Sequence, residues 1–92
     1  MNVNTRSLGV IAWEIDKDWS SKGKGVNVHA RPYLDAMKSM YKISDKYGLE
    51  DGIMVVLYFL SNARQWRGPV ARELKKELNA MVESEKTRTR GY

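Results

Sequence analysis

The sequence contains no cysteine, which excludes a disulfide framework and any metal site built from thiolates. Its single histidine, His29, could join only carboxylates as a metal ligand, whereas zinc sites usually need several nitrogen or sulfur ligands. We therefore predict that the protein holds no metal and no cofactor. The lack of disulfides also fits a reducing compartment.

The sequence lacks the long apolar segments of membrane proteins and secreted precursors. The apolar run at residues 53–60 is far shorter than the ~20 residues that span a bilayer. The N-terminus has no uninterrupted apolar stretch followed by a small-residue cleavage site, so it does not resemble a secretory signal. We expect a cytoplasmic protein that does not associate with membranes.

Catalytic motifs are missing as well. Gly23, Lys24 and Gly25 form a segment too short to hold a phosphate chain, and residues 59–63 lack the glycines of a nucleophile elbow. Asp16 and Asp18 lie near the end of a predicted helix, where we interpret them as solubilising charges. The sequence therefore predicts that the protein is not an enzyme.

Basic residues are in excess in this chain of 92 residues. Sixteen Lys and Arg against eleven Asp and Glu give a formal net charge of +5. That balance favours acidic partners, such as nucleic acid or an acidic protein. The length allows one domain with one core, which we predict over residues 1–86, followed by a frayed tail at 87–92.

Apolar spacing predicts four helices, and therefore an all-α domain. The first helix has an N-cap at Asn4 or Thr5 and one apolar face. Residues 20–31 interrupt the pattern with two glycines, and a second helix is predicted over 32–47, closed by Gly48. The inward residues of the first helix are Leu8, Ile11, Ala12, Ile15 and Trp19.

Residues 53–67 form the third predicted helix. Their valines and aromatics also favour a strand, but the segment runs on without a turn residue, and its only strand partner is the weak alternation at 26–30. Because residues 53–60 are apolar on every side, we expect the domain to pack around this helix. Gly68 and Pro69 separate it from the fourth helix, whose predicted inward residues are Val70, Leu74, Leu78, Met81 and Val82.

Basic residues cluster where the third helix ends and the fourth begins. This basic edge has the composition of a phosphate-binding surface with a stacking platform, and it consists of Arg64, Trp66, Arg67, Arg72, Lys75 and Lys76. Alternatively, its charges are a solvated helical face and Trp66 belongs to the core. A second group, the basic loop, contains Lys22, Lys24, His29 and Arg31. Such loops often touch nucleic acid or a partner, although a basic protein has basic loops by default.

Aromatic residues at the margins of the predicted core are a third candidate feature. Three Trp, five Tyr and five Met in 92 residues match the composition of interface centres. Trp13 lies off the apolar stripe of the first helix, so it is either at the edge of the core or exposed. With Trp66, Tyr41, Tyr47 and Tyr92, it supports either a homodimer or docking on another protein.

Several of these segments together resemble a group of small uncharacterised proteins from bacteriophages of Gram-positive hosts. The similarity is carried by Tyr58-Phe59-Leu60-Ser61-Asn62-Ala63 with Trp66-Arg67-Gly68, and by Pro32-Tyr33-Leu34-Asp35-Ala36-Met37. It extends over residues 8–80. The resemblance implies a phage origin and a role in the host cytoplasm, where small phage proteins commonly bind and redirect a host or phage macromolecule.

Two functional hypotheses follow. The leading one is a non-enzymatic phage protein that engages a host or phage protein, in a host-takeover or anti-defence role, through the basic edge and the basic loop. The alternative is a nucleic-acid-binding protein that uses the same basic edge. The two differ in salt dependence, because binding to phosphates weakens steeply as salt rises.

Overall fold

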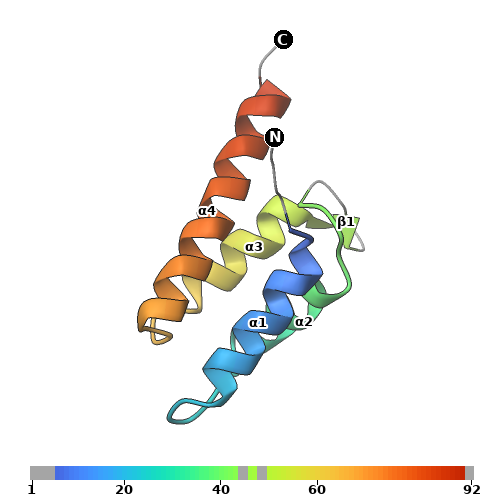
Figure 1. Ribbon diagram of the computed structural model, residues 1–92. Helices are drawn as coiled ribbons and strands as arrows, with labels where there is room; N and C mark the ends of the chain where they lie inside the picture. The colour runs from blue at the N-terminus through green and yellow to red at the C-terminus, as the bar shows by residue number, and fades with distance from the viewer. Residues whose placement is uncertain (1–5, 44–45, 48–49, 91–92) are drawn as a thin grey trace.

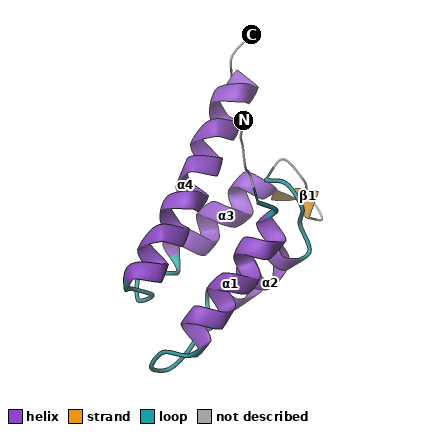
Figure 2. Cartoon of the chain, viewed as in Figure 1, coloured by secondary structure: helices purple, strands orange, loops and turns teal. Residues whose placement is uncertain are grey.

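Four helices and one pair of very short strands make up the computed structural model, which describes residues 6–43, 46–47 and 50–90 (Figure 1). The helices are α1 (Leu8–Ser20), α2 (Arg31–Lys38), α3 (Gly52–Ser61) and α4 (Pro69–Arg90). The strands β1 (Lys46–Tyr47) and β2 (Glu50–Asp51) pair in antiparallel fashion just before α3. Helices dominate the chain in Figure 2, and the predicted all-α class is confirmed.

The helices pack in a ring rather than around one central helix. α1 contacts α2 and α4, and α3 contacts the same two helices. The predicted central position of the third helix is therefore not observed. α4 is the longest helix, and its C-terminal end projects beyond the N-terminal end of α3 (Figure 1).

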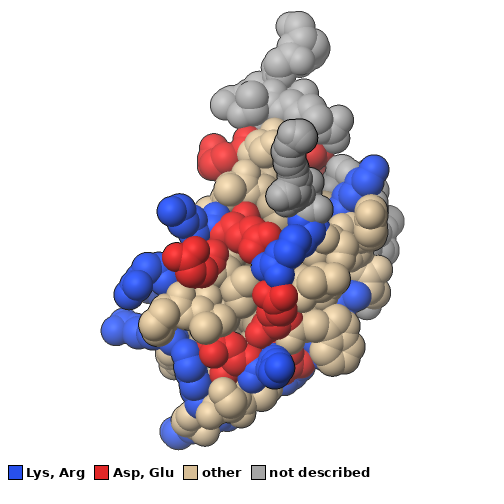
Figure 3. Space-filling view, viewed as in Figure 1, with Lys and Arg blue, Asp and Glu red and all other residues tan. Residues whose placement is uncertain are grey.

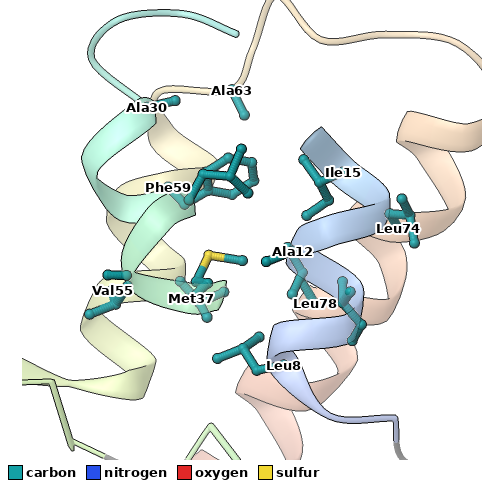
Figure 4. Packing of buried hydrophobic residues seen from close by; sticks show 14 of the residues in the cluster. Leu8, Ala12, Ile15, Ala30, Met37, Val55, Phe59, Ala63, Leu74 and Leu78 are labelled. Carbon is teal, nitrogen blue, oxygen red and sulfur yellow. The ribbon is translucent and has the colours of Figure 1, made fainter. Parts of the chain in front are cut away.

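The core is built from side chains of all four helices. In Figure 4, Leu8 and Ala12 of α1 lie opposite Met37 of α2, with Phe59 of α3 and Leu78 of α4 completing the cluster. The buried residues of this core are Leu8, Ile11, Ala12, Ile15, Trp19, Ala30, Leu34, Ala36, Met37, Met40, Ile43, Val55, Val56, Phe59, Ala63, Trp66, Ala71, Leu74, Leu78 and Val82. Among the residues whose burial the structure describes, no charged side chain is fully buried.

α1 has the apolar face that the sequence predicts, and all five of its predicted inward residues are buried. Its start differs from the prediction. The N-cap is Ser7, whose hydroxyl accepts a hydrogen bond from the backbone N–H of Val10 at 3.1 Å. Asn4 and Thr5, the predicted caps, lie outside the described residues.

The Ser7 cap leads to a stability prediction. Ser7→Ala removes the side-chain acceptor of the first turn of α1, so we expect a loss of about 1 kcal/mol of unfolding free energy. Ser7→Gly, which keeps the cap backbone accessible to water, should cost only a few tenths of a kcal/mol. Urea denaturation of the two variants measures the difference. Equal losses would show that the hydroxyl does not act as a cap.

α2 begins where Pro32 predicts but ends at Lys38, well before the predicted end at residue 47. The chain leaves the helix so that the carbonyl oxygens of Met40 and Tyr41 can accept hydrogen bonds from the backbone N–H groups of Gly9 and Leu8, at 2.8 and 2.9 Å. Those N–H groups have no partner within α1, so a second segment caps it. This approach needs glycine at position 9, because a Cβ there would lie 2.8 Å from the Lys38 carbonyl oxygen. The predicted cap Gly48 lies outside the described residues.

α3 is shorter and less buried than the sequence predicts. It ends at Ser61, because the side chains of Ser61 and Asn62 both donate to the carbonyl oxygen of Tyr58, at 3.0 and 2.8 Å. Tight turns then carry the chain to Trp66. Val55, Val56 and Phe59 face the core, but Met54 and Tyr58 are 36% and 39% exposed, so the helix is not buried on every side.

α4 begins at Pro69 as predicted and continues to Arg90. Its buried stripe is Ala71, Leu74, Leu78 and Val82, whereas Val70, predicted to face inward, is exposed. The domain boundary predicted at residue 86 falls inside this helix. Once a helix is nucleated, each further residue adds a hydrogen bond at low cost, so it can extend beyond its last buried residue.

Candidate functional site

Trp66 is part of the core and not part of an exposed surface. It is 1% exposed, its ring stacks on Trp19 with centroids 5.7 Å apart, and it meets Phe59 edge to face at 6.4 Å. Its Nε1 donates to the carboxylate of Asp18 at 2.9 Å. The prediction that Trp66 contacts a partner or stacks on bases is therefore wrong, and the alternative that places it in the core is correct.

The backbone around Trp66 brings the basic edge and the basic loop together. Lys22 Nζ donates to the carbonyl oxygen of Arg67 at 2.8 Å, and Lys75 Nζ donates to the carbonyl oxygen of Trp66 at 2.6 Å. Two lysines from different segments thus hold two consecutive carbonyls. Gly68 follows at φ +112°, a conformation that favours glycine and turns the chain into α4.

We call the resulting cluster the basic corner, defined by Lys22, Lys24, Arg67, Arg72 and Lys75. Two adjoining hollows of about 420 and 320 Å³ share Trp66 and Arg67 in their walls. The first is lined by both lysines of the loop, and the second by Arg72 and Lys75. No carboxylate side chain lines either hollow. In Figure 3, basic side chains gather along this edge, and acidic ones lie over the face between α1 and α4.

Positive charges in the basic corner are incompletely neutralised. Asp18 accepts from Lys22 at 3.0 Å, and although burial opposes its ionisation, the Trp66 and Lys22 hydrogen bonds lower its pKa. Burial lowers the pKa of Lys75, and the nearby charge of Arg67 lowers it further. Within the described residues, the side chains of Lys24, Arg67 and Arg72 form no ion pair or hydrogen bond.

The remaining predicted site residues lie elsewhere. Lys76 lines a separate groove between α1 and α4. That groove is lined also by Glu73, Glu77 and Arg6, and Arg6 pairs with Glu14 and Glu77. Arg64 is exposed on the turn after α3, and His29 is exposed where its backbone N–H donates to the side chain of Asn27. Neither lines the basic corner.

Arg31 is engaged in an ion-pair network centred on Asp16. Arg31 Nη1 lies 2.9 Å from Asp16 Oδ2 and 3.2 Å from Asp35, and Lys38 also donates to Asp16. The hydrogen bond from Arg31 is the main cause that holds the pKa of Asp16 well below its usual range. Burial opposes this shift, and the hydrogen bonds from Lys38 and Ser20 add to it. Asp16 and Asp18 are therefore structural groups that join α1 to other segments, and interpreting them as solubilising charges is wrong.

A second surface is apolar and lies at the opposite end of α1. Trp13 is 61% exposed, and with exposed Val10 and Tyr41 it borders a shallow hollow of about 360 Å³. Lys38 Nζ lies 4.1 Å from the centre of the Trp13 ring and so joins this surface to the Asp16 network. We call Val10, Trp13 and Tyr41 the Trp13 surface. The sequence indicates this surface in one way, because Trp13 lies outside the apolar stripe that α1 turns toward the core.

The described residues contain neither a metal-binding group nor a membrane-spanning helix. No three histidine, aspartate or glutamate side chains among them form a group that could hold a metal ion. No helix in that part of the chain combines the length and the hydropathy that crossing a bilayer requires.

Comparison of the chain with protein-family models, with curated proteins and with solved structures gave no match. The basic corner and the Trp13 surface are therefore the features of the described residues from which a function can be inferred.

Proposed function

We propose that this protein is a non-enzymatic binding protein that docks on another protein through the Trp13 surface. The observation that carries the proposal is the 61% exposure of Trp13 beside exposed Val10 and Tyr41. Tryptophan and tyrosine dominate the binding energy of protein interfaces, and large aromatic groups are costly to leave in water. The partner is a protein that offers an apolar surface, of phage or host origin as the resemblance implies.

The surroundings of Trp13 prepare it for binding. Lys38 lies over one face of the ring, and the ammonium of Lys38 is itself held by Asp16 and by Asp35, the latter at 3.5 Å. A cation over an aromatic ring stabilises its position by about 0.5–1 kcal/mol at exposed sites. Because the ring is restrained before the partner arrives, less side-chain entropy is lost on docking.

The test is affinity capture from nuclease-treated infected-cell lysate, with wild-type protein and Trp13→Ala as baits. We expect a protein captured by the wild type to be reduced at least tenfold by Trp13→Ala, since central aromatic anchors contribute about 2 kcal/mol or more. Val28→Ser is the matched control, because Val28 is an exposed apolar residue on the loop before α2 and does not line the Trp13 hollow.

Three outcomes would count against the proposal. Equal capture by wild type and Trp13→Ala would remove Trp13 from the interface. Loss of every captured protein after nuclease treatment would show that nucleic acid mediated the capture. A doubled mass in light scattering that Trp13→Ala reverses would make a second copy of this chain the occupant of the surface.

A further inference from the structure

The basic corner is independent of the Trp13 surface and has the chemistry of a different ligand. Within the described residues it holds five cationic side chains, of which Lys22 pairs with the Asp18 carboxylate, so these six groups carry a formal charge of +4. We propose that the basic corner binds the phosphate backbone of double-stranded nucleic acid, without reading its sequence. This goes beyond docking on a protein partner, and the two activities can be separated by mutation.

The geometry of the corner fixes part of its positive charge in place. Lys22 and Lys75 are anchored on the carbonyl oxygens of Arg67 and Trp66, whose ring lies 5.6 Å from Lys75 Nζ. These two lysines lose little additional freedom when an anion binds. The N-terminal end of α4 adds the partial positive charge of a helix start beside Gly68.

Other cations of the corner are available to a ligand. Lys24, Arg67 and Arg72 have no side-chain partner within the described part of the chain, and they line the two hollows on either side of Trp66. An arginine can donate two parallel hydrogen bonds to one phosphate. Burial is the main cause that lowers the pKa of Lys75, and the charge of Arg67 lowers it further, a repulsion that a bound phosphate would relieve.

Among the described residues, the basic corner offers no accessible aromatic ring, which favours duplex over single-stranded nucleic acid. Single-strand binding proteins stack bases on aromatic side chains, but the two rings next to the corner, Trp19 and Trp66, are buried against each other. Recognition is then limited to phosphates, which position a protein on a duplex but carry no sequence information. The higher charge density of a duplex also gives more counterion release per contact.

The test is fluorescence anisotropy with a labelled 20-base-pair DNA of several sequences, and with the matching single strands, from 25 to 200 mM salt. We expect similar affinity for all duplex sequences and weaker binding of the single strands. With about five phosphate contacts, the plot of log affinity against log salt concentration should have a slope of about −4.5.

Point substitutions locate the contacts. Lys24→Gln and Arg72→Gln should each weaken duplex binding by about three- to tenfold at low salt and reduce the salt slope by about one. Lys76→Gln is the matched control, because it removes the same charge from α4 but lines the groove that faces Glu73 and Glu77. Trp13→Ala should leave DNA binding unchanged, and thermal melting of each variant confirms that it is folded.

Several results would overturn the proposal. The first is no duplex binding at 25 mM salt, and the second is tighter binding of single strands than of duplexes. The third is an equal effect of Lys76→Gln and Lys24→Gln, which would show that binding depends on the net charge of the protein and not on the basic corner. Equal affinity for polyglutamate, or displacement of the duplex by millimolar inorganic phosphate, would also overturn it, because the site would then be a general anion site.

Discussion

Trp66→Ala should lower the free energy of unfolding by about 3–5 kcal/mol, the range observed when a large buried aromatic is truncated to alanine. The ring is 1% exposed and packed between Trp19 and Phe59, so its removal leaves a cavity that these neighbours only partly fill. The substitution also removes the hydrogen bond that Trp66 Nε1 donates to the Asp18 carboxylate. Urea denaturation followed by circular dichroism at 25 °C measures the loss.

Two further variants separate packing from hydrogen bonding at this position. Trp66→Phe keeps an aromatic ring but cannot donate to Asp18, so its cost should lie below that of Trp66→Ala. Trp13→Ala should cost less than about 1 kcal/mol, because exposed side chains contribute little to stability. If Trp66→Ala unfolded within about 1 kcal/mol of the wild type, Trp66 would be a surface residue after all, and the basic corner would lose its aromatic floor.

The apolar spacing of α1 predicts all the buried residues of this helix except Gly9. Each of the residues 8, 11, 12, 15 and 19 is buried, since one uninterrupted helix packs against α2 on one side and α4 on the other. The ends of α2 and α3 could not be predicted in this way. α2 stops because the following carbonyls cap α1, a contact between residues about thirty positions apart, and such contacts leave no periodic signal.

Composition identifies the basic residues but not their arrangement. The basic loop and the basic edge meet through the bond from Lys22 to the Arg67 carbonyl, which joins positions 45 residues apart. The same folding step buries Trp66 against Trp19, so an arginine-flanked tryptophan that resembles a stacking platform becomes the floor of the corner. A tryptophan next to arginines in sequence does not distinguish these two arrangements.

The charged residues of α4 also show that neighbours in the sequence need not lie on the same surface. Lys75 and Lys76 are neighbours in sequence, yet Lys75 lines the basic corner and Lys76 lines the groove with Glu73 and Glu77. Successive helical residues point about 100° apart, so a run of charges divides between two faces. Of the basic residues predicted for this edge, Arg67, Arg72 and Lys75 therefore lie in the basic corner, where Lys22 and Lys24 join them from the loop.

Asp16→Asn is expected to destabilise the fold by about 2–3 kcal/mol at pH 7, because it removes the negative charge that Arg31 and Lys38 share and replaces one acceptor oxygen by an NH2 group. The carboxylate is only 16% exposed, and Lys38 is 17% exposed, so water replaces the lost bonds poorly. The substitution also releases Lys38 from its position over Trp13, and therefore should weaken partner capture through the Trp13 surface.

The pH dependence of stability identifies the ionised carboxylate as the cause. Because its hydrogen bonds, that from Arg31 first, lower the pKa of Asp16 in the folded state, the unfolded chain binds a proton there more readily. The contribution of Asp16 is thus fully present above about pH 5, and it is lost as the pH falls through the unfolded pKa of about 3.9 toward the lower folded pKa. The difference in unfolding free energy between wild type and Asp16→Asn should therefore be constant from pH 7 to 5 and shrink between pH 5 and 2.

Asp35→Asn, at an exposed acid of the same network, is the control and should show a much smaller difference at every pH. A wild-type advantage that persists unchanged at pH 2 would mean that shape or packing at position 16, and not its charge, stabilises the junction of α1 and α2.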